Sequence, residues 1–154
     1  MFPPVEVRIA AAEDADVVAA LLHDFNTEYD TPSPGAAVLA GRLRTLLAGT
    51  ATIALLADEP PTGVALVTLR PNVWYEGGVA LLDELYVRPG LRGRGVGTAM
   101  LARAFELLRA RRAGLFEVNV DEDDSGARRF YERHAFLNVP PGQRERMLYY
   151  EREL

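Results

Sequence analysis

The stretch LYVRPGLRGRGVGTAML, residues 85–101, places glycines and arginines between an apolar run and an amphipathic run. A strand that turns into a helix through glycines exposes backbone N–H groups at the positive end of the helix dipole. Such a turn binds a phosphate or pyrophosphate, and the side chains of Arg92 and Arg94 can add charge-assisted hydrogen bonds. The alternatives are a tight turn with solvated arginines, or a site for another phosphorylated ligand such as a nucleotide.

The composition limits the chemistry that the chain can perform. Cysteine and lysine are both absent, which removes disulfides, thiolate metal sites, cysteine nucleophiles and a Schiff-base lysine. The net charge of −5 argues against general nucleic-acid binding, and no apolar run is long enough for a membrane span. No secretory signal is visible, so the cytoplasm is the expected location. The length of 154 residues suits a single domain over residues 1–154.

Positive charge is nevertheless concentrated in one part of the chain. Residues 88–112 contain a single acid, and this local stripe favours a compact anionic ligand over a long polyanion. The stripe consists of Arg88, Arg92, Arg94, Arg103, Arg109, Arg111 and Arg112, with Glu106 as the acid.

Hydrophobic periodicity predicts elements in the order β-α-α-β-β-β-α-β-α-β. This order indicates an α/β (α+β) fold with a single mixed, mostly antiparallel β-sheet flanked by helices. The expected strands are 5–10, 51–58, 63–70, 79–87, 115–120 and 146–154, and the expected helices are 12–29, 36–49, 95–112 and 125–135.

The longer stretch LDELYVRPGLRGRGVGTAML resembles the acetyl-CoA motif of the GNAT-type N-acetyltransferase superfamily. That motif is Q/R-x-x-G-x-G/A after a strand, and Arg92, Gly95 and Gly97 fill it. The resemblance implies a GNAT-like acyl-CoA N-acyltransferase fold with acetyl-CoA as co-substrate, in which backbone N–H groups hold the pyrophosphate of coenzyme A. The implied contacts are the backbone of Leu85 and Val87 on the pantetheine arm, and Arg92, Gly93, Arg94, Gly95, Val96, Gly97 and Thr98 around the pyrophosphate.

A second family signature, N-x-x-A followed by an aromatic-Tyr pair and Gly-Phe, is similar to DSGARRFYERHAF, residues 124–136. Ala127, the Phe130–Tyr131 pair and Phe136 are in register. The resemblance implies that Asp124, Ala127 and Phe130 contact the cofactor and that Tyr131 is catalytic.

Two positions depart from this signature. Asp124 stands where the family often has Asn; it can cap the helix but cannot donate a hydrogen bond as an amide does. Ala135 stands where the family often has Gly, and a side chain there is expected to resist a left-handed helix end.

Candidate catalytic residues follow from the reaction that the resemblance implies. The leaving thiolate needs a proton, which the hydroxyl of Tyr131 can supply; the alternative is a tyrosine that only packs at a helix edge. The attacking amine must lose a proton, and Glu84, or failing that Asp83, can accept it. These carboxylates interrupt an apolar run and are expected on opposite faces of a strand. The alternative role for them is salt bridging to nearby arginines.

The lack of an obvious nucleophile or metal site, together with the net charge, leads to the hypothesis of direct transfer in a ternary complex. Ser33 and Ser125 lie outside any nucleophile elbow, and His23 and His134 lack ligand spacing, so no metal is expected. The acidic balance favours a small cationic primary amine, such as an aminoglycoside, a polyamine or a peptide N-terminus. A non-catalytic acyl-CoA-binding sensor is the alternative function, and a homodimer is left open. Acceptor contacts are expected from Glu28, Tyr29, Asp30, Trp74 and Tyr75, which are otherwise ordinary loop residues.

Overall fold

The computed structural model describes every residue from Met1 to Leu154 and divides the chain into two compact units. The first unit comprises residues 1–116 and the second residues 117–154. Along the chain the helices and strands are β1 (Val7–Ile9), α1 (Ala15–Glu28), α2 (Ala36–Ala48), β2 (Thr52–Ala57), β3 (Gly63–Arg70), β4 (Val79–Val87), α3 (Val96–Ala110), β5 (Leu115–Val118) and α4 (Ser125–Arg133).

The sheet has five strands in the order β1-β2-β3-β4-β5, and the three pairs from β1 to β4 are antiparallel. The expected fold class, one mixed sheet accompanied by helices, is confirmed. None of the helices combines the length and the apolar character that a membrane span needs.

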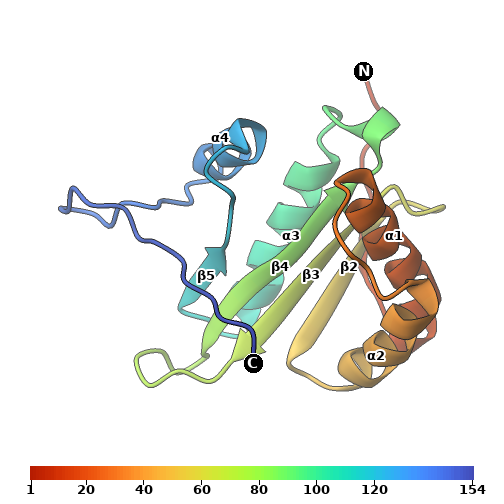
Figure 1. Ribbon diagram of the computed structural model, residues 1–154, viewed down its shortest axis with the longest axis horizontal. Helices are drawn as coiled ribbons and strands as arrows, with labels where there is room; N and C mark the ends of the chain where they lie inside the picture. The colour runs from red at the N-terminus through yellow and green to blue at the C-terminus, as the bar shows by residue number, and fades with distance from the viewer. The chain divides into compact units, whose positions relative to one another are not determined.

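Two helices cover one face of the sheet and a third covers the other (Figure 1). On the first face, Leu56, Val64 and Tyr86 pack in one core with side chains of α1 and α2 such as Val18 and Leu43. Each large apolar side chain buried in this way stabilises the fold by about 1.5–3 kcal/mol. This core fixes the position of α1, whose last turn approaches the end of β4.

Helix α3 packs against the opposite face. It buries Val96, Met100, Leu101, Ala104 and Leu108, which recur at the spacing of one helical face. Gly63 on β3 allows this close approach, because a Cβ there would lie 2.9 Å from the terminal methyl carbon of Met100. The burial of Val96 and Met100 fixes the first turn of α3, which directly follows the glycine–arginine turn.

A β-bulge interrupts the pairing of β3 with β4. Leu66 lies opposite Glu84, but the next residue, Val67, lies opposite Leu82. Asp83 is therefore an extra residue with no partner across the ladder. Bulges of this kind re-aim side chains, and this one lies at the two acids of the apolar strand.

Helix α4 is the regular element that lies wholly in the second unit. It begins at Asp124, whose carboxylate Oδ1 accepts the N–H of Ala127 at 2.9 Å, so the expected cap is present. None of the residues 117–154 is buried.

The expectation for Ala135 is wrong. Ala135 adopts a left-handed φ of 64°, and the helix ends there in a Schellman motif. The N–H of Phe136 donates to the carbonyl of Tyr131 at 3.0 Å, and the N–H of Ala135 donates to that of Glu132 at 3.1 Å. The rings of Tyr131 and Phe136 lie 5.5 Å apart. These contacts offset a backbone conformation that costs an alanine about 1–2 kcal/mol.

The expected closing strand over residues 146–154 is also wrong. These residues form no helix or strand. Their apolar residues, Met147 to Tyr150, are consecutive and exposed, so they do not supply the single apolar face that would be buried against a sheet. The N–H of Met147 instead donates to the carbonyl of Asn138 at 2.8 Å.

Candidate active site

The turn between β4 and α3 is built around two left-handed glycines. Gly93 has a φ of 72° and Gly95 a φ of 83°, and Arg94 lies between them. Gly95 is the N-cap of α3, and no side chain caps this helix end. A Cβ built on either glycine meets nothing within 4 Å, so the space above the turn is open. The first N–H groups of α3 have no acceptor within the helix, and an anion placed above them would satisfy them.

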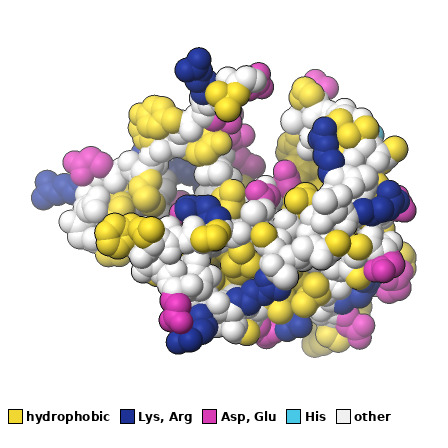
Figure 2. All heavy atoms as spheres, turned by 90° about the horizontal axis from the view of Figure 1, so that it is seen from below, with side chains coloured by type: hydrophobic (Ala, Val, Ile, Leu, Met, Phe, Trp, Pro, Cys, Tyr) yellow, Lys and Arg dark blue, Asp and Glu magenta, His cyan; other side chains and the backbone are white.

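The arginine stripe of residues 88–112 is largely paired within the protein. Four of its members form ion pairs with carboxylates, and Arg111 donates to the carbonyl of Thr50. Figure 2 shows basic and acidic side chains interspersed over one face of the molecule. The four pairs are Arg88 with Asp24, Arg92 with Glu28, Arg103 with Glu106 and Arg112 with Glu76.

Arg94 differs from the two arginines that precede it in the turn. Its guanidinium lies 4.8 Å from the ring of Phe2, and no carboxylate pairs with it. The guanidinium of Arg92, by contrast, donates to both carboxylate oxygens of Glu28, at 2.9 and 2.7 Å. Arg94 is thus the arginine of the turn whose charge no protein anion neutralises.

The bulge places Asp83 and Glu84 on the same face of the sheet, which corrects the expectation that they point to opposite faces. Glu84 pairs across the ladder with Leu66, whose side chain packs against the core beneath α1 and α2. Asp83 accepts a short hydrogen bond from the hydroxyl of Thr68. Thr68 is two residues from Leu66 and therefore on the same face. Both carboxylates thus belong to the side of the sheet that α1 and α2 cover.

Glu84 is the more deeply placed of the two acids. Burial raises the pKa of its carboxyl above the ordinary value, and the neighbouring charge of Asp83 raises it further. No arginine pairs with either acid, so the alternative of paired salt bridges is not what the structure contains. A carboxylate with a raised pKa and no cationic partner is a stronger base than an ordinary carboxylate and is suited to accept a proton from a substrate.

The expected residues of the second signature lie on α4. The ring of Tyr131 lies 5.2 Å from that of Phe130, and Phe130 also contacts the imidazole of His134. The imidazole Nδ1 of His134 hydrogen-bonds the carbonyl of Phe130 at 2.7 Å. Asp124 and Ala127 are joined by the helix cap, so one oxygen of Asp124 and the N–H of Ala127 are already used.

The expected acceptor residues do not form one group. Glu28 ends α1 and contacts Arg92 beyond the end of β4, whereas Trp74 and Tyr75 belong to the loop that precedes β4. A strand of nine residues separates the two positions by roughly 25–30 Å. A small acceptor cannot contact both, and Trp74 is 84% exposed.

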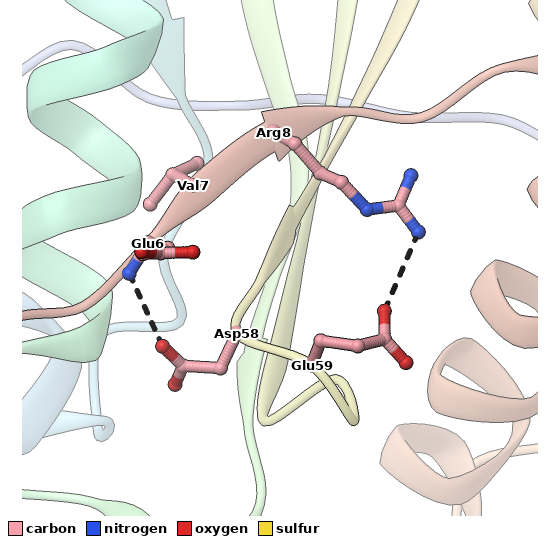
Figure 3. A pocket seen from close by; sticks show the side chains of 5 residues that line it. All are labelled: Glu6, Val7, Arg8, Asp58 and Glu59. Atoms are coloured by element: carbon pink, nitrogen blue, oxygen red, sulfur yellow. Dashed lines mark hydrogen bonds and ion pairs between the residues drawn. The ribbon is translucent and has the colours of Figure 1, made fainter.

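A cavity lies elsewhere in the first unit. It has a volume of about 390 Å³ and lies between β1 and the β2–β3 connection (Figure 3). Its polar groups are bonded within the fold: Asp58 accepts the N–H of Glu6, and Arg8 donates to both carboxylate oxygens of Asp14 and lies 3.9 Å from Glu59. It contains none of the residues expected at the site, and its charges are accounted for by the fold.

Sequence reasoning missed two contributors to this region, Thr68 and Asp24, and expected Glu28 at the acceptor and not at Arg92. Thr68 bonds Asp83, and Asp24 and Glu28 hold Arg88 and Arg92. Asp24 and Glu28 are four residues apart on α1 and therefore share a face, which is the one signal that the sequence offered.

Comparisons with known proteins identify the family and the fold. The model of the acetyltransferase (GNAT) family matches residues 15–136. A crystal structure of a candidate acetyltransferase from Arthrobacter sp. FB24 is 56% identical, with a TM-score of 0.92 over 97% of this chain and 96% of that one. A structure of AAC(6')-Iy with the bisubstrate analog CoA-S-monomethyl-acetylneamine has a TM-score of 0.78 at 14% identity, covering 99% of this chain and 100% of that one.

A curated relative matches over a shorter region. The mycothiol acetyltransferase of Beutenbergia cavernae is 36% identical over 74 residues, which are 46% of this chain and 25% of that protein. The chain therefore spans only about a quarter of this relative's length. The family match and the Arthrobacter structure, in contrast, extend over most of the chain. On these grounds the chain belongs to the acetyltransferase (GNAT) family, whose members transfer acetyl groups from acetyl-CoA.

Proposed function

We propose that residues 1–154 act as one N-acetyltransferase domain that transfers the acetyl group of acetyl-CoA to a primary amine. The acceptor is a small cation, and the amine attacks directly while both substrates are bound. The observation that carries this proposal is the glycine–arginine turn, where Gly93 and Gly95 leave the uncapped start of α3 open above its N–H groups. The family match spans both units of the chain, which supports treating them as one functional domain.

The turn fits the pyrophosphate of coenzyme A in shape and charge. The backbone N–H groups of residues 93–98 supply donors, and the two glycines let a ligand approach the backbone closely. Arg94 supplies a positive charge that no protein carboxylate neutralises. The N–H groups of a helix start and a flexible guanidinium together suit a compact dianion.

The pantetheine arm is assigned to the edge of β4. The N–H of Gly114 donates to the carbonyl of Gly78 at 3.0 Å, so β5 begins level with the start of β4. β5 has four residues and β4 has nine, so β5 is too short to accompany the whole of β4. Leu85 and Val87, near the end of β4, can pair with an extended arm as with an added strand.

Glu84 is assigned as the base, with Asp83 as the second candidate. Acetyl-CoA supplies an activated thioester. The cationic amine first passes a proton to Glu84, directly or through a water molecule. The neutral nitrogen then bonds to the acetyl carbon, the bond from that carbon to sulfur breaks, and the nitrogen releases its second proton to solvent. The raised pKa of Glu84 and the lack of an arginine partner support this role.

Tyr131 is assigned as the acid that protonates the departing thiolate. The support is its register in the second family signature and its place on α4, three residues before the helix C-cap His134. Its ring is held by Phe130 and Phe136 on either side, which orients the hydroxyl.

A cationic acceptor suits the acids of the α1 and α2 side of the sheet. Asp83 and Glu84 lie there without an arginine partner, and such an arrangement attracts a protonated amine. Tyr29 and Asp30, which follow α1, are assigned to the acceptor, since the connection they begin lies on the same side. Trp74 and Tyr75 are the alternative contacts, at the other end of β4.

The test combines binding with turnover. Coenzyme A should bind in calorimetry, ATP should not displace it, and free thiol should appear from acetyl-CoA only when an amine is added. Coenzyme A binding without thiol release across aminoglycosides, polyamines and peptides would identify an acyl-CoA sensor instead. Equal competition by ATP would identify a general nucleotide site.

A further inference from the structure

The side chain of Arg92 is held at three places. Its Nη2 donates to both carboxylate oxygens of Glu28, at 2.9 and 2.7 Å, and its Nε donates to the carbonyl of Val87 at 2.9 Å. Its guanidinium carbon lies 5.7 Å from the ring centre of Tyr86. The side chains of Arg92 and Glu28 are 39% and 25% exposed, so the pair is partly shielded from solvent. One whole donor edge of the guanidinium is therefore used within the protein.

The partner of Arg92 is itself rigidly placed. Glu28 is the last residue of α1, and one turn earlier the ring of Phe25 stacks on Tyr86 with centroids 5.1 Å apart. Asp24, four residues before Glu28, pairs with Arg88 at 3.2 Å. The end of α1 therefore contacts the β4–α3 turn at two successive arginines, four residues apart on each segment.

We propose that Glu28 is a positioning residue for the phosphate turn. It holds Arg92 as a fixed support for the turn, called the strut below, so that the side chain of Arg94 and not that of Arg92 reaches the pyrophosphate. This inference rests on the proposed function of the same turn. It takes Glu28 away from the acceptor, because its carboxylate is already shared with Arg92. It also ties the turn to the start of the α1–α2 connection, where Tyr29 and Asp30 follow Glu28 directly.

The opposite arrangement is a switch, in which the pyrophosphate takes Arg92 away from Glu28. That exchange would break the bonds to Glu28 and to the carbonyl of Val87, and it would leave a partly buried carboxylate unpaired. Arg94 is available without any such loss. The two arrangements predict opposite changes in coenzyme A affinity when the charge of Glu28 is removed. Removing the Glu28 charge weakens coenzyme A binding if Arg92 is a strut, and strengthens it if Glu28 competes with the ligand.

The experiment is calorimetric titration of the full chain with coenzyme A, comparing wild type with Glu28→Gln. The chain offers a matched control in Asp16→Asn, since Asp16 on the same helix forms a bidentate pair with Arg44 at 2.8 and 2.9 Å. Glu28→Gln should weaken binding by roughly 3–10-fold, the range of a charge-assisted pair, and Asp16→Asn should leave it unchanged. With acetyl-CoA, the KM of Glu28→Gln should rise while kcat at saturation stays close to wild type.

Two further variants separate positioning from general stability. Adding Glu28→Gln to Arg92→Ala should cause no further loss, because the pair acts as a unit. The reversed pair, Glu28→Arg with Arg92→Glu, should bind coenzyme A more tightly than either single variant. Arg94→Ala should weaken binding independently, and its loss should shrink as salt rises.

These measurements distinguish a failure of the proposed function from a failure of the positioning role of Glu28. If wild type does not bind coenzyme A, the proposed function falls and the strut falls with it. If wild type binds and Glu28→Gln binds equally well or more tightly, the strut alone is overturned and the proposed function stands.

Discussion

Asp83 and Glu84 are neighbours in the chain, and yet both side chains belong to the same face of the sheet. The bulge opposite Leu66 and Val67 removes the usual alternation at this one step. Asp83 is satisfied by the hydroxyl of Thr68, and Glu84 is buried enough for its pKa to rise. Two adjacent acids thus have different environments on one face, which separates their chemical roles.

Glu84→Gln should lower turnover by about 10²–10⁴-fold, the usual worth of a general base, while leaving coenzyme A affinity unchanged. The defect should lessen as pH rises, because the amine then arrives already deprotonated. The measurement is the pH profile of kcat for both proteins. Asp83→Asn is the control, and if it shows this profile while Glu84→Gln does not, the assignment of the two acids is reversed.

The same substitution should also change stability. Because burial raises the pKa of Glu84 in the folded chain, ionising it opposes folding at every pH above its unfolded pKa. Glu84→Gln removes this cost, so the variant should melt at a higher temperature than wild type at neutral pH. Below its unfolded pKa, Glu84 is protonated in both the folded and the unfolded chain. The difference in melting temperature between wild type and Glu84→Gln should therefore vanish there. A variant that is less stable at neutral pH would show that the carboxylate is stabilised by contacts.

Gly95→Val should weaken coenzyme A binding by at least about tenfold, or 1.4 kcal/mol. Its φ of 83° disfavours a β-branched residue, and the new side chain would occupy the open space above the turn. Calorimetry measures the effect, and circular dichroism checks that the variant is folded. Gly90→Ala is the control, since Gly90 has neither a positive φ nor a neighbour within 4 Å of a built Cβ. Unchanged affinity in folded Gly95→Val would remove the phosphate site from this turn.

Tyr131→Phe should reduce turnover by about 10²–10⁴-fold, because only the proton for the thiolate is lost. The ring keeps its contacts with Phe130 and Phe136, so the melting temperature and coenzyme A affinity should change little. An acetyl thioester with a more acidic thiol should depend less on this residue. If the variant keeps more than about half its activity while chemistry limits the rate, Tyr131 is a packing residue.

Ala135→Gly should stabilise the end of α4 by about 1 kcal/mol, since glycine adopts the left-handed φ of 64° without penalty. Hydrogen exchange at the N–H groups of residues 135 and 136 reports local opening of the end of α4. This exchange should slow by about fivefold in the variant. Ala102→Gly, at an exposed site within α3, is the control and should destabilise by about 0.5–1 kcal/mol. Faster exchange in Ala135→Gly would mean that the methyl group of Ala135 makes contacts that matter more than the strain.

Most of the fold could be predicted because it depends on local pattern. The bounds of β3 and β4 agree with the sequence-based expectation at both ends, since turn residues flank each apolar run. The glycine turn between strand and helix could also be predicted, whereas the left-handed φ angles of Gly93 and Gly95 are seen only in the structure.

The missed features depend on contacts between distant residues. The bulge at Asp83 is set by how β3 pairs with β4, which alternation along one strand does not encode. The pair of Arg92 with Glu28 joins residues 64 positions apart, so nothing local distinguishes it from two solvated charges. The Tyr131–Phe136 contact that lets Ala135 end a helix is visible only once the helix end is folded.

Acetyl transfer itself is measured by mixing the purified chain with acetyl-CoA and a panel of primary amines, and by following free thiol together with the mass of the product. We predict thiol release that requires an amine and that is slowed in Glu84→Gln, and a product that carries one acetyl group on nitrogen. Tight binding of coenzyme A with no amine-dependent thiol release, or equal release by Glu84→Gln at every pH, would contradict this prediction.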